Sequence, residues 1–260
     1  MLKDNETKKY HIACTADDIG KYCILPGDPG RCEKIAAYLD DAKFVVSNRE
    51  YTTYTGYLCG EKVSVVSTGI GGPSAAIALE ELVSLGAHTF IRIGTCGGIN
   101  TKVCAGDVVI ATSAVRCDGT TREYAPECFP ATADFEVTVA LSEAAADLGL
   151  NYHTGTVHSK DSFYGQADPE NMPMSEFLKE RWNTWKKLGV LASEMEASTL
   201  FVVGATRTVK CGACFSVVWN QEREKLGFFE PECHDTDKAI RVCVAAMKKI
   251  IKKSQRTVAI

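Results

Sequence analysis

The chain has 260 residues, of which 45% are hydrophobic, and a formal net charge of -4 at pH 7. This length and composition suit one globular α/β domain over residues 1–260. Without an excess of basic residues we expect no nucleic-acid partner, and no apolar run reaches the roughly 18 residues that a membrane span needs. The charged residues 1–9 lack the apolar core of a signal peptide, which predicts a cytoplasmic location.

Strand-like and helix-like segments alternate along the chain, which predicts an α/β fold with a central mixed β-sheet flanked by helices. In the first half we expect strands at residues 22–25, 63–67, 89–93 and 107–112, with helices at 31–39 and 74–85. A polar loop at 118–130 and a long connection at 160–173 interrupt the second half. There we expect strands at 154–158 and 212–219, and helices at 136–148, 175–187, 197–206 and 237–252. On the helix at 175–187, Trp182 and Trp185 are expected to be core contacts.

Twelve cysteines are scattered through the chain, most of them inside apolar runs. This usage is typical of small hydrophobic side chains in a reducing compartment rather than of a disulfide framework. The CxxC pair Cys211 and Cys214 leads into a strand-like run instead of opening a helix, and no second pair lies nearby. We therefore expect neither a redox pair nor a zinc site there.

Three of the expected strands end in glycine-rich turns, after Leu25, Ser67 and Ile93. Such turns expose backbone N–H groups at strand ends or helix starts, where anions bind. The second turn resembles a dinucleotide fingerprint, but its third glycine is missing and no acidic residue ends the next strand. We therefore expect no Rossmann cofactor and no other organic cofactor.

Arg92 lies inside the apolar strand at 89–93. Removing a guanidinium from water is costly, so Arg92 must pair with an internal carboxylate or bind an anionic ligand. On this strand alone, an internal salt bridge is the more common explanation. Arg31 follows the first turn and Arg49 lies between two of the expected strands. With Gly27 and Thr95 they offer forked donors, backbone amides and a hydroxyl that suit phosphate. The set as a whole favours an anion site.

Four motifs resemble those of the hexameric nucleoside phosphorylases: Pro26-Gly-Asp-Pro-Gly-Arg31, Ser67-Thr-Gly-Ile-Gly-Gly-Pro-Ser74, Arg92-Ile-Gly-Thr-Cys-Gly-Gly98 and Ser193-Glu-Met-Glu-Ala-Ser198. They occur in the family's order, and the similarity runs from about His11 to the last helix. The resemblance implies a nucleoside phosphorylase/hydrolase-like fold and a pentosyltransferase, in which inorganic phosphate is the co-substrate and attacks C1' of a nucleoside. It also implies a homodimer or a homohexamer built as a trimer of dimers.

The same resemblance implies the site residues. Those expected to bind phosphate are Gly27, Arg31, Arg49, Arg92 and Thr95, with Arg49 contributed by a neighbouring subunit. Those expected to bind ribose are Glu194, Met195, Glu196 and, across subunits, His11. The base-binding set is Phe163, Gln166, Lys160, Asn220 and Arg223, and the residues expected to be catalytic are Arg92, Glu196 and Gln166. Relatives also bind a monovalent cation, such as potassium, at positions that match Glu50, Ile70 and Ser74.

The base-binding positions favour a pyrimidine. Gln166 resembles the glutamine that binds the O2/N3 edge of a pyrimidine, and purine-specific relatives carry an Asp in the segment where Asn220 stands. The resemblance thus implies reversible phosphorolysis of uridine or deoxyuridine to uracil and the pentose 1-phosphate, a step of pyrimidine salvage. Two arginines of the pyrimidine pattern are missing, because Asp168 and Gln221 stand in their places. Lys160 and Arg223 are the nearest cations that could replace them.

Three alternatives stay open. One is a purine nucleoside phosphorylase with an atypical base pocket. Another is a hydrolytic relative, which would not need Arg31, Arg49 and Arg92 together. The third is a non-catalytic nucleoside-binding protein on the same fold, although a pure binder gains nothing from a site for the nucleophile.

Overall fold

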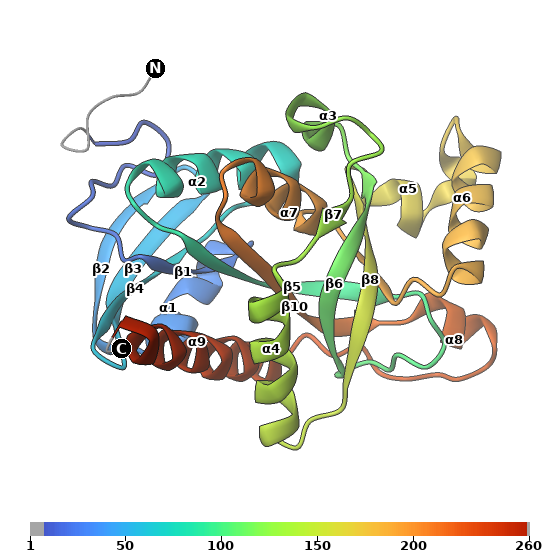
Figure 1. Ribbon diagram of the computed structural model, residues 1–260. Coiled ribbons are helices and arrows are strands. Elements are labelled where there is room, and N and C mark those ends of the chain that lie inside the picture. Colours follow the sequence, from blue (N-terminus) through green and yellow to red (C-terminus); the bar gives the residue numbers. More distant parts are fainter. Residues whose placement is uncertain (1–7, 259–260) are drawn as a thin grey trace.

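A mixed β-sheet of ten strands forms the centre of the computed structural model, which describes residues 8–258 (Figure 1). Residues 1–7, which carry most of the N-terminal segment used to predict a cytoplasmic location, lie outside the described residues. The strands are β1 (Tyr22–Pro26), β2 (Asp40–Asn48), β3 (Tyr51–Leu58), β4 (Glu61–Val66), β5 (Thr89–Gly98), β6 (Val108–Cys117), β7 (Ala131–Thr132), β8 (Tyr152–Lys160), β9 (Ala192–Glu194) and β10 (Lys210–Trp219).

Helices connect and flank these strands. They are α1 (Cys32–Ala36), α2 (Gly72–Ser84), α3 (Thr120–Tyr124), α4 (Phe135–Asp147), α5 (Tyr164–Ala167), α6 (Ser175–Lys187), α7 (Ala197–Thr206), α8 (Gln221–Lys225) and α9 (Asp237–Val258), with short 3-10 helices η1 (Pro29–Arg31) and η2 (Pro169–Asn171). Within residues 8–258, no helix combines the length and the apolar character that a membrane crossing requires.

The sheet order is β10-β6-β8-β9-β5-β1-β4-β3-β2, and β10 also pairs with β5. The strands β5, β9, β8, β6 and β10 therefore close into a ring, while β1 to β4 extend it as an open sheet. Parallel pairs such as β1–β5 and β8–β9 stand beside antiparallel pairs such as β5–β9 and β6–β10. Closure brings the ends of β5, β8 and β9 together, which places the site described below.

Helices cover both faces of the sheet (Figure 1). One apolar core lies between the sheet and α2 and α7, with Leu79 and Phe201 among its members, and the other lies on the side of α1, α4 and α9. Along β5, Phe90 belongs to the first core and Ile91 to the second. Because strand side chains alternate between faces, Arg92 points to the same side as Phe90, toward α2 and α7.

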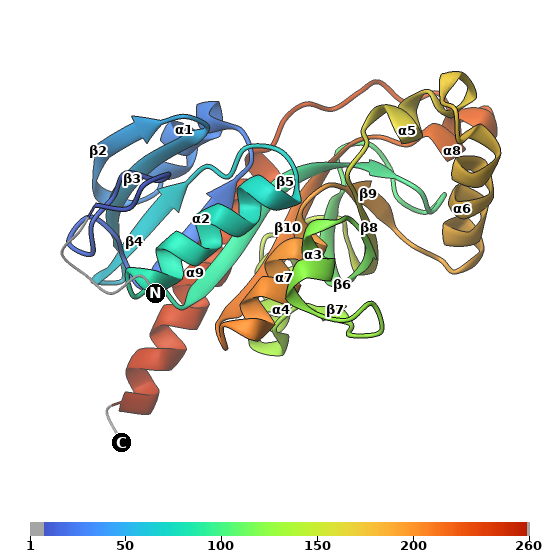
Figure 2. The ribbon, with the colours of Figure 1, turned by 90° about the horizontal axis from the view of Figure 1, so that it is seen from above.

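The helices α5, α6 and α8 gather at the end of the molecule beyond β8, away from both cores (Figure 2). None of the 13 described residues of α6 is buried. The expectation that Trp182 and Trp185 are core contacts is therefore wrong. Their helix has an apolar face, but that face lines a cavity instead of the core.

Most predicted segments are present, with shifted ends. Helix α1 is shorter than the expected helix at 31–39, and the loop at 118–130 and the connection at 160–173 contain α3, α5 and η2. Four strands were not predicted: β2 and β3, which pair as a hairpin, and the short strands β7 and β9. All twelve cysteines are free thiols and seven are buried, which confirms their use as small apolar side chains.

Candidate active site

Arg92 is 4% exposed and lies where β5 approaches the starts of α2 and α7. Its Nη2 atom donates to Glu196 Oε2, and its Nη1 atom lies 3.4 Å from Thr68 Oγ1. Its Nε atom is buried without a hydrogen-bond partner among the described residues, 3.7 Å from Glu194 Oε2. Arg92 thus forms an internal salt bridge, whereas the sequence favoured an anion site. The guanidinium still keeps an unused N–H group, however, which an additional acceptor could satisfy.

Glu196 joins Arg92 to the N-terminus of α2. Its Oε1 atom accepts a 2.6 Å hydrogen bond from the backbone N–H of Gly71. Gly71 has a φ of 91°, a conformation that residues with a side chain rarely adopt, and this turn aims the N–H at the carboxylate. An anion between a guanidinium and a helix N-terminus is favoured by both positive charges.

Gly27 and Arg31 complete this cluster from the turn after β1. A Cβ atom at Gly27 would lie 3.6 and 3.8 Å from the two Nη atoms of Arg92, so the glycine leaves the face of that guanidinium open. Burial lowers the pKa of Arg31, Asp28 and Glu196 counteract this, and the charge of Arg92 lowers it further. The structure therefore brings Gly27, Arg31, Arg92 and Glu196 together, and half-buried Thr95 follows on β5.

Glu194 has a structural task at the start of α7. Its carboxylate accepts from the backbone N–H groups of Glu196 and Ala197, both at 2.9 Å, and from Ser159 Oγ. Burial raises the pKa of Glu194 and the neighbouring carboxylate of Glu196 raises it further, whereas Arg92 and these hydrogen bonds lower it. With its oxygens engaged in this way, Glu194 fixes the start of α7, and its predicted contact with ribose stays a prediction.

Met195, unlike the buried Glu194, lines a surface hollow. It lines a groove of about 720 Å³ together with Ile70, Gly71 and Asp161. Because the N–H of Gly71 binds Glu196, this groove opens beside the Arg92 cluster. Asp161 also lines the cavity described next, so the two hollows adjoin at that residue.

A cavity of about 690 Å³ between β8 and the helices α5, α6 and α8 holds two of the predicted base-binding residues, Lys160 and Gln166. The Oε1 atom of Gln166 is buried and finds no hydrogen-bond partner within residues 8–258. Lys160 Nζ donates to Ser193 Oγ at 2.9 Å. Burial lowers the pKa of Lys160 to about 8, although Glu194, Glu196 and Cys96 counteract the shift. Lys160 is thus a buried cation whose charge is easily lost.

The cavity also has an aromatic wall that the sequence did not reveal. Trp182 and Trp185 from α6 and Trp219 from the end of β10 line it, and so does His158. Burial lowers the pKa of His158 to about 3, helped by the charges of Lys160 and Arg181, so its imidazole is neutral near pH 7. In the sequence, this wall could have been recognised from the expected helix at 175–187, which carries two tryptophans but few other apolar residues.

Phe163 precedes α5 and is 59% exposed, with its ring packed edge-on against Tyr164 at 5.5 Å between centroids. It is not among the described residues that line the cavity. Its predicted contact with the base is therefore not formed by this arrangement of α5.

Asn220 and Arg223 make structural contacts, and their predicted contacts with the base stay predictions. The Nδ2 atom of Asn220 donates to the carbonyls of Asn100 and Val103, and its Oδ1 atom accepts from two N–H groups at the start of α8. Arg223 pairs with Glu230, and its guanidinium lies 5.0 Å from the centroid of the Phe228 ring. Of the two cations considered as replacements for the missing arginines, only Lys160 lines the cavity within the described part of the chain.

His11 and Arg49 lie together, in a group separate from Arg92. His11 Nδ1 is 2.7 Å from Glu81 Oε1 on α2, and the carbonyl of His11 accepts from Asn48 Nδ2 at 2.7 Å. The guanidinium of Arg49 lies 5.6 Å from the ring centroid of Tyr10, next to His11. Their predicted roles across a subunit boundary stay predictions.

The residues expected to hold a monovalent cation are close to each other. Ser74 Oγ donates to Glu50 Oε1 at 2.8 Å, and the side chain of Ile70 is exposed. Carboxylate and hydroxyl oxygens suit a hard cation. Over residues 8–258, however, no cluster of three His, Cys, Asp or Glu side chains could hold a metal ion. The potassium site stays a prediction.

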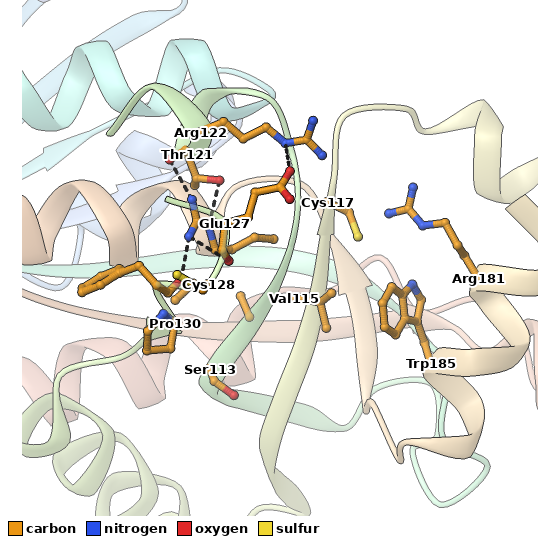
Figure 3. A pocket seen from close by; sticks show the side chains of 14 residues that line it. Ser113, Val115, Cys117, Thr121, Arg122, Glu127, Cys128, Pro130, Arg181 and Trp185 are labelled. Atoms are coloured by element: carbon orange, nitrogen blue, oxygen red, sulfur yellow. Dashed lines mark hydrogen bonds and ion pairs between the residues drawn. The ribbon is translucent and has the colours of Figure 1, made fainter. Parts of the chain in front are cut away.

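A third hollow lies on the other side of α6, between β6 and the connection from α3 to β7 (Figure 3). Arg181 and Trp185 project from α6 toward Val115 and Cys117, and Arg122 pairs with Glu127 at 3.1 Å. Cys117, Arg181 and Trp185 also line the cavity around Lys160 and Gln166. These three residues therefore separate that cavity from the third hollow. No residue predicted for the site lines this third hollow in the part of the chain described.

Comparison with known proteins identifies the family of this chain. A family model described as the phosphorylase superfamily matches residues 21–254. The chain belongs to the phosphorylase superfamily. It is 53% identical to the uridine phosphorylase of Treponema pallidum (strain Nichols) over 94% of this chain and 94% of that protein. It is 39% identical to the uridine phosphorylase of Escherichia coli (strain K12), over 93% and 98% of the two chains.

Not every similar member of the phosphorylase superfamily is named for a pyrimidine. The chain is 37% identical to the guanosine phosphorylase of Halorubrum lacusprofundi over 82% of this chain and 84% of that protein. In this superfamily member the Arg92 cluster is accompanied by a separate cavity beyond β8, which contains the predicted base-binding residues Lys160 and Gln166.

The structural role of Asn220 is testable. Asn220→Ala removes the cap of α8 and leaves two carbonyls without a donor, so the free energy of unfolding should fall by about 1–3 kcal/mol. Asn220→Asp keeps the capping oxygen and should lose less. Urea titration followed by circular dichroism measures both. An unchanged stability with a raised KM for nucleoside would contradict the structural role and restore the base contact.

Proposed function

We propose that this protein is a uridine phosphorylase, which converts uridine and phosphate reversibly to uracil and ribose 1-phosphate in pyrimidine salvage. The observation that carries the proposal is the Arg92 cluster, which has a donor unused and lies beside a cavity that contains Gln166 and Lys160. The likeness to uridine phosphorylases over nearly the whole chain supports the same reaction.

Phosphate is a weak and strongly hydrated nucleophile, so the site has to hold it dry and oriented. Arg92 and Arg31 supply the positive charge, and Gly27 leaves room for the anion against the Arg92 guanidinium. Fixing phosphate beside C1' turns a bimolecular encounter into an oriented attack. One phosphate oxygen bonds to C1' as the bond from C1' to N1 breaks, and the electron pair of that bond stays on the base.

Glu196 has two tasks in this proposal. Without substrate its carboxylate neutralises Arg92 and binds the N–H of Gly71. A phosphate dianion competes for the same guanidinium, and this competition releases an oxygen of Glu196 to accept hydrogen bonds from the ribose hydroxyls. Negative charge beside the sugar then stabilises the oxocarbenium character of the transition state.

Lys160 and Gln166 act on the base. The unpaired Oε1 of Gln166 accepts from the N3–H of uracil, and its amide group donates to the O2 atom. Lys160 places a positive charge in a cavity with little water, where charge develops on the leaving base. In this way one lysine on β8 replaces the two arginines that are missing from the pyrimidine pattern.

A purine nucleoside phosphorylase is the second candidate, favoured by the similarity to a guanosine phosphorylase and by a cavity larger than one pyrimidine ring needs.

The assembly stays part of the proposal: a homodimer or homohexamer in which His11 and Arg49 contribute across subunits. The cytoplasmic location and the single domain over residues 1–260 also stay part of it. Sedimentation that found a fully active monomer would contradict the assembly.

The direct test is incubation with uridine, deoxyuridine, thymidine, inosine or guanosine, each with and without phosphate. We expect release of uracil from uridine that depends on phosphate, with ribose 1-phosphate as the second product. Release without phosphate would indicate a hydrolase, and a preference for inosine or guanosine would favour the purine alternative. Binding without turnover of any of them would leave only a nucleoside-binding protein.

Replacement of Arg92 tests the phosphate site. Arg92→Ala removes the buried charge that attracts the anion, so the KM for phosphate should rise about 100-fold, the usual size for loss of a preorganised charged donor. Uridine binding, followed by isothermal titration without phosphate, should stay detectable. If phosphate saturation is unchanged in a folded variant, the phosphate site lies elsewhere.

The charge of Lys160 should appear in the pH profile. Because its pKa is lowered to about 8, Lys160 is charged below that pH and loses its charge above it. We expect kcat/KM for uridine to fall as the pH rises through about 8. Lys160→Arg keeps the charge and should remove this alkaline limb, whereas Lys160→Met should lower kcat about 100-fold at neutral pH. A limb that persists in Lys160→Arg would assign it to another group.

A further inference from the structure

Helix α6 forms the outer wall of the cavity around Lys160 and Gln166, which we call the base-side cavity, although α6 has no buried residue to anchor it. A helix is normally held by the apolar face that it buries. In α6 that face, with Trp182 and Trp185, borders the cavity instead. Something other than core packing must therefore set the distance of this wall from β8.

The neighbouring α8 is anchored firmly to the body of the protein. Asn220 caps its first turn and at the same time binds the carbonyls of Asn100 and Val103, which follow β5. Trp219, just before α8, donates through Nε1 to Glu224 Oε2 at 3.0 Å. These contacts fix α8 relative to the ring of strands, so α8 can serve as the support of the wall.

One carboxylate connects the two helices. Glu222, on α8, is 6% exposed and accepts from Trp182 Nε1 at 2.8 Å and from Lys186 Nζ at 2.9 Å, both on α6. Lys225 of α8 donates to the same carboxylate at 2.8 Å. Burial alone would raise the pKa of Glu222, but the hydrogen bonds from Lys225, Lys186 and Trp182 together lower it to about 2. The carboxylate therefore stays ionised throughout the neutral range.

We propose that Glu222 is a positioning residue that holds α6 against α8 and so fixes the tryptophan wall of the base-binding cavity. Glu222 does not touch the reacting atoms in this proposal. Its effect on the reaction rests on the proposed function, because it acts through the cavity that would bind the base. Hydrogen bonds to a buried charge are stronger than those between neutral groups. The hydrogen bonds of Glu222, which we call the Glu222 tie, can therefore hold α6 in place of core packing.

The number and position of the tryptophans allow the effect of the Glu222 hydrogen bonds to be followed by fluorescence. The three tryptophans of the protein, Trp182, Trp185 and Trp219, all line this cavity. Intrinsic tryptophan fluorescence therefore reports on the wall alone, without background from the core. Quenching by acrylamide measures how accessible the wall is and needs no substrate.

The test compares Glu222→Gln with Glu180→Gln, which makes the same chemical change at an exposed position of α6. In Glu222→Gln we expect the acrylamide quenching constant to rise about twofold and the KM for uridine about tenfold, the size of one lost hydrogen bond to a charged group. The KM for phosphate and kcat should stay within about threefold of wild type, because the Arg92 cluster is separate from this wall. Glu180→Gln should match wild type in every measurement.

A folded Glu222→Gln variant with wild-type quenching would overturn the proposal, and so would a KM for phosphate that rises as much as that for uridine. If Glu222→Gln fails to fold, Lys186→Met removes one donor from the same tie and should raise quenching to a smaller extent, and unchanged quenching there would also overturn it. If quenching rises in Glu222→Gln but the wild-type protein does not turn over uridine, the role of Glu222 in holding α6 stands and uridine is rejected as the substrate.

Discussion

The cost of holding the Arg92 charge out of water is the constraint on which the rest of this site depends. A buried guanidinium needs negative partners, which are Glu194 at the end of β9 and Glu196 just before α7. Those carboxylates in turn need donors, which are the N–H of Gly71 for Glu196 and the N–H groups at the start of α7 for Glu194. The charge of one strand residue thus fixes the starts of two helices and the turn that connects β4 to α2.

In the proposed reaction, the same arrangement couples the binding of phosphate to the chemistry. Arg92 keeps a buried Nε without a partner, so its electrostatic demand is not fully met by the protein. An anion that completes it competes with Glu196, and the displaced carboxylate lies next to the place of the sugar. In this proposal, one equilibrium between two acceptors of a single guanidinium links occupation of the proposed phosphate site to preparation of the proposed ribose site.

The proposed function separates specificity for the base in space from this electrostatic centre. Lys160 extends from the end of β8, and the cavity around it is closed by helices that belong to neither apolar core. A peripheral wall can vary without disturbing the Arg92 cluster, because the two share few contacts. This separation fits a superfamily in which relatives of similar overall identity are named for uridine and for guanosine.

Sequence alone determined the α/β class, most segments and the grouping of Gly27 and Arg31 with Arg92, because glycine turns and an arginine inside an apolar strand are local signals. It missed β9, which has only three residues, and β9 aligns Ser193 with His158 and so brings Lys160 to Ser193. It placed Asn220 in the base pocket and Trp182 in the core, since a side chain's type does not say which neighbour it faces. Only the closed ring of strands and the packing of α6 and α8 decided those contacts, because they join residues far apart in the chain.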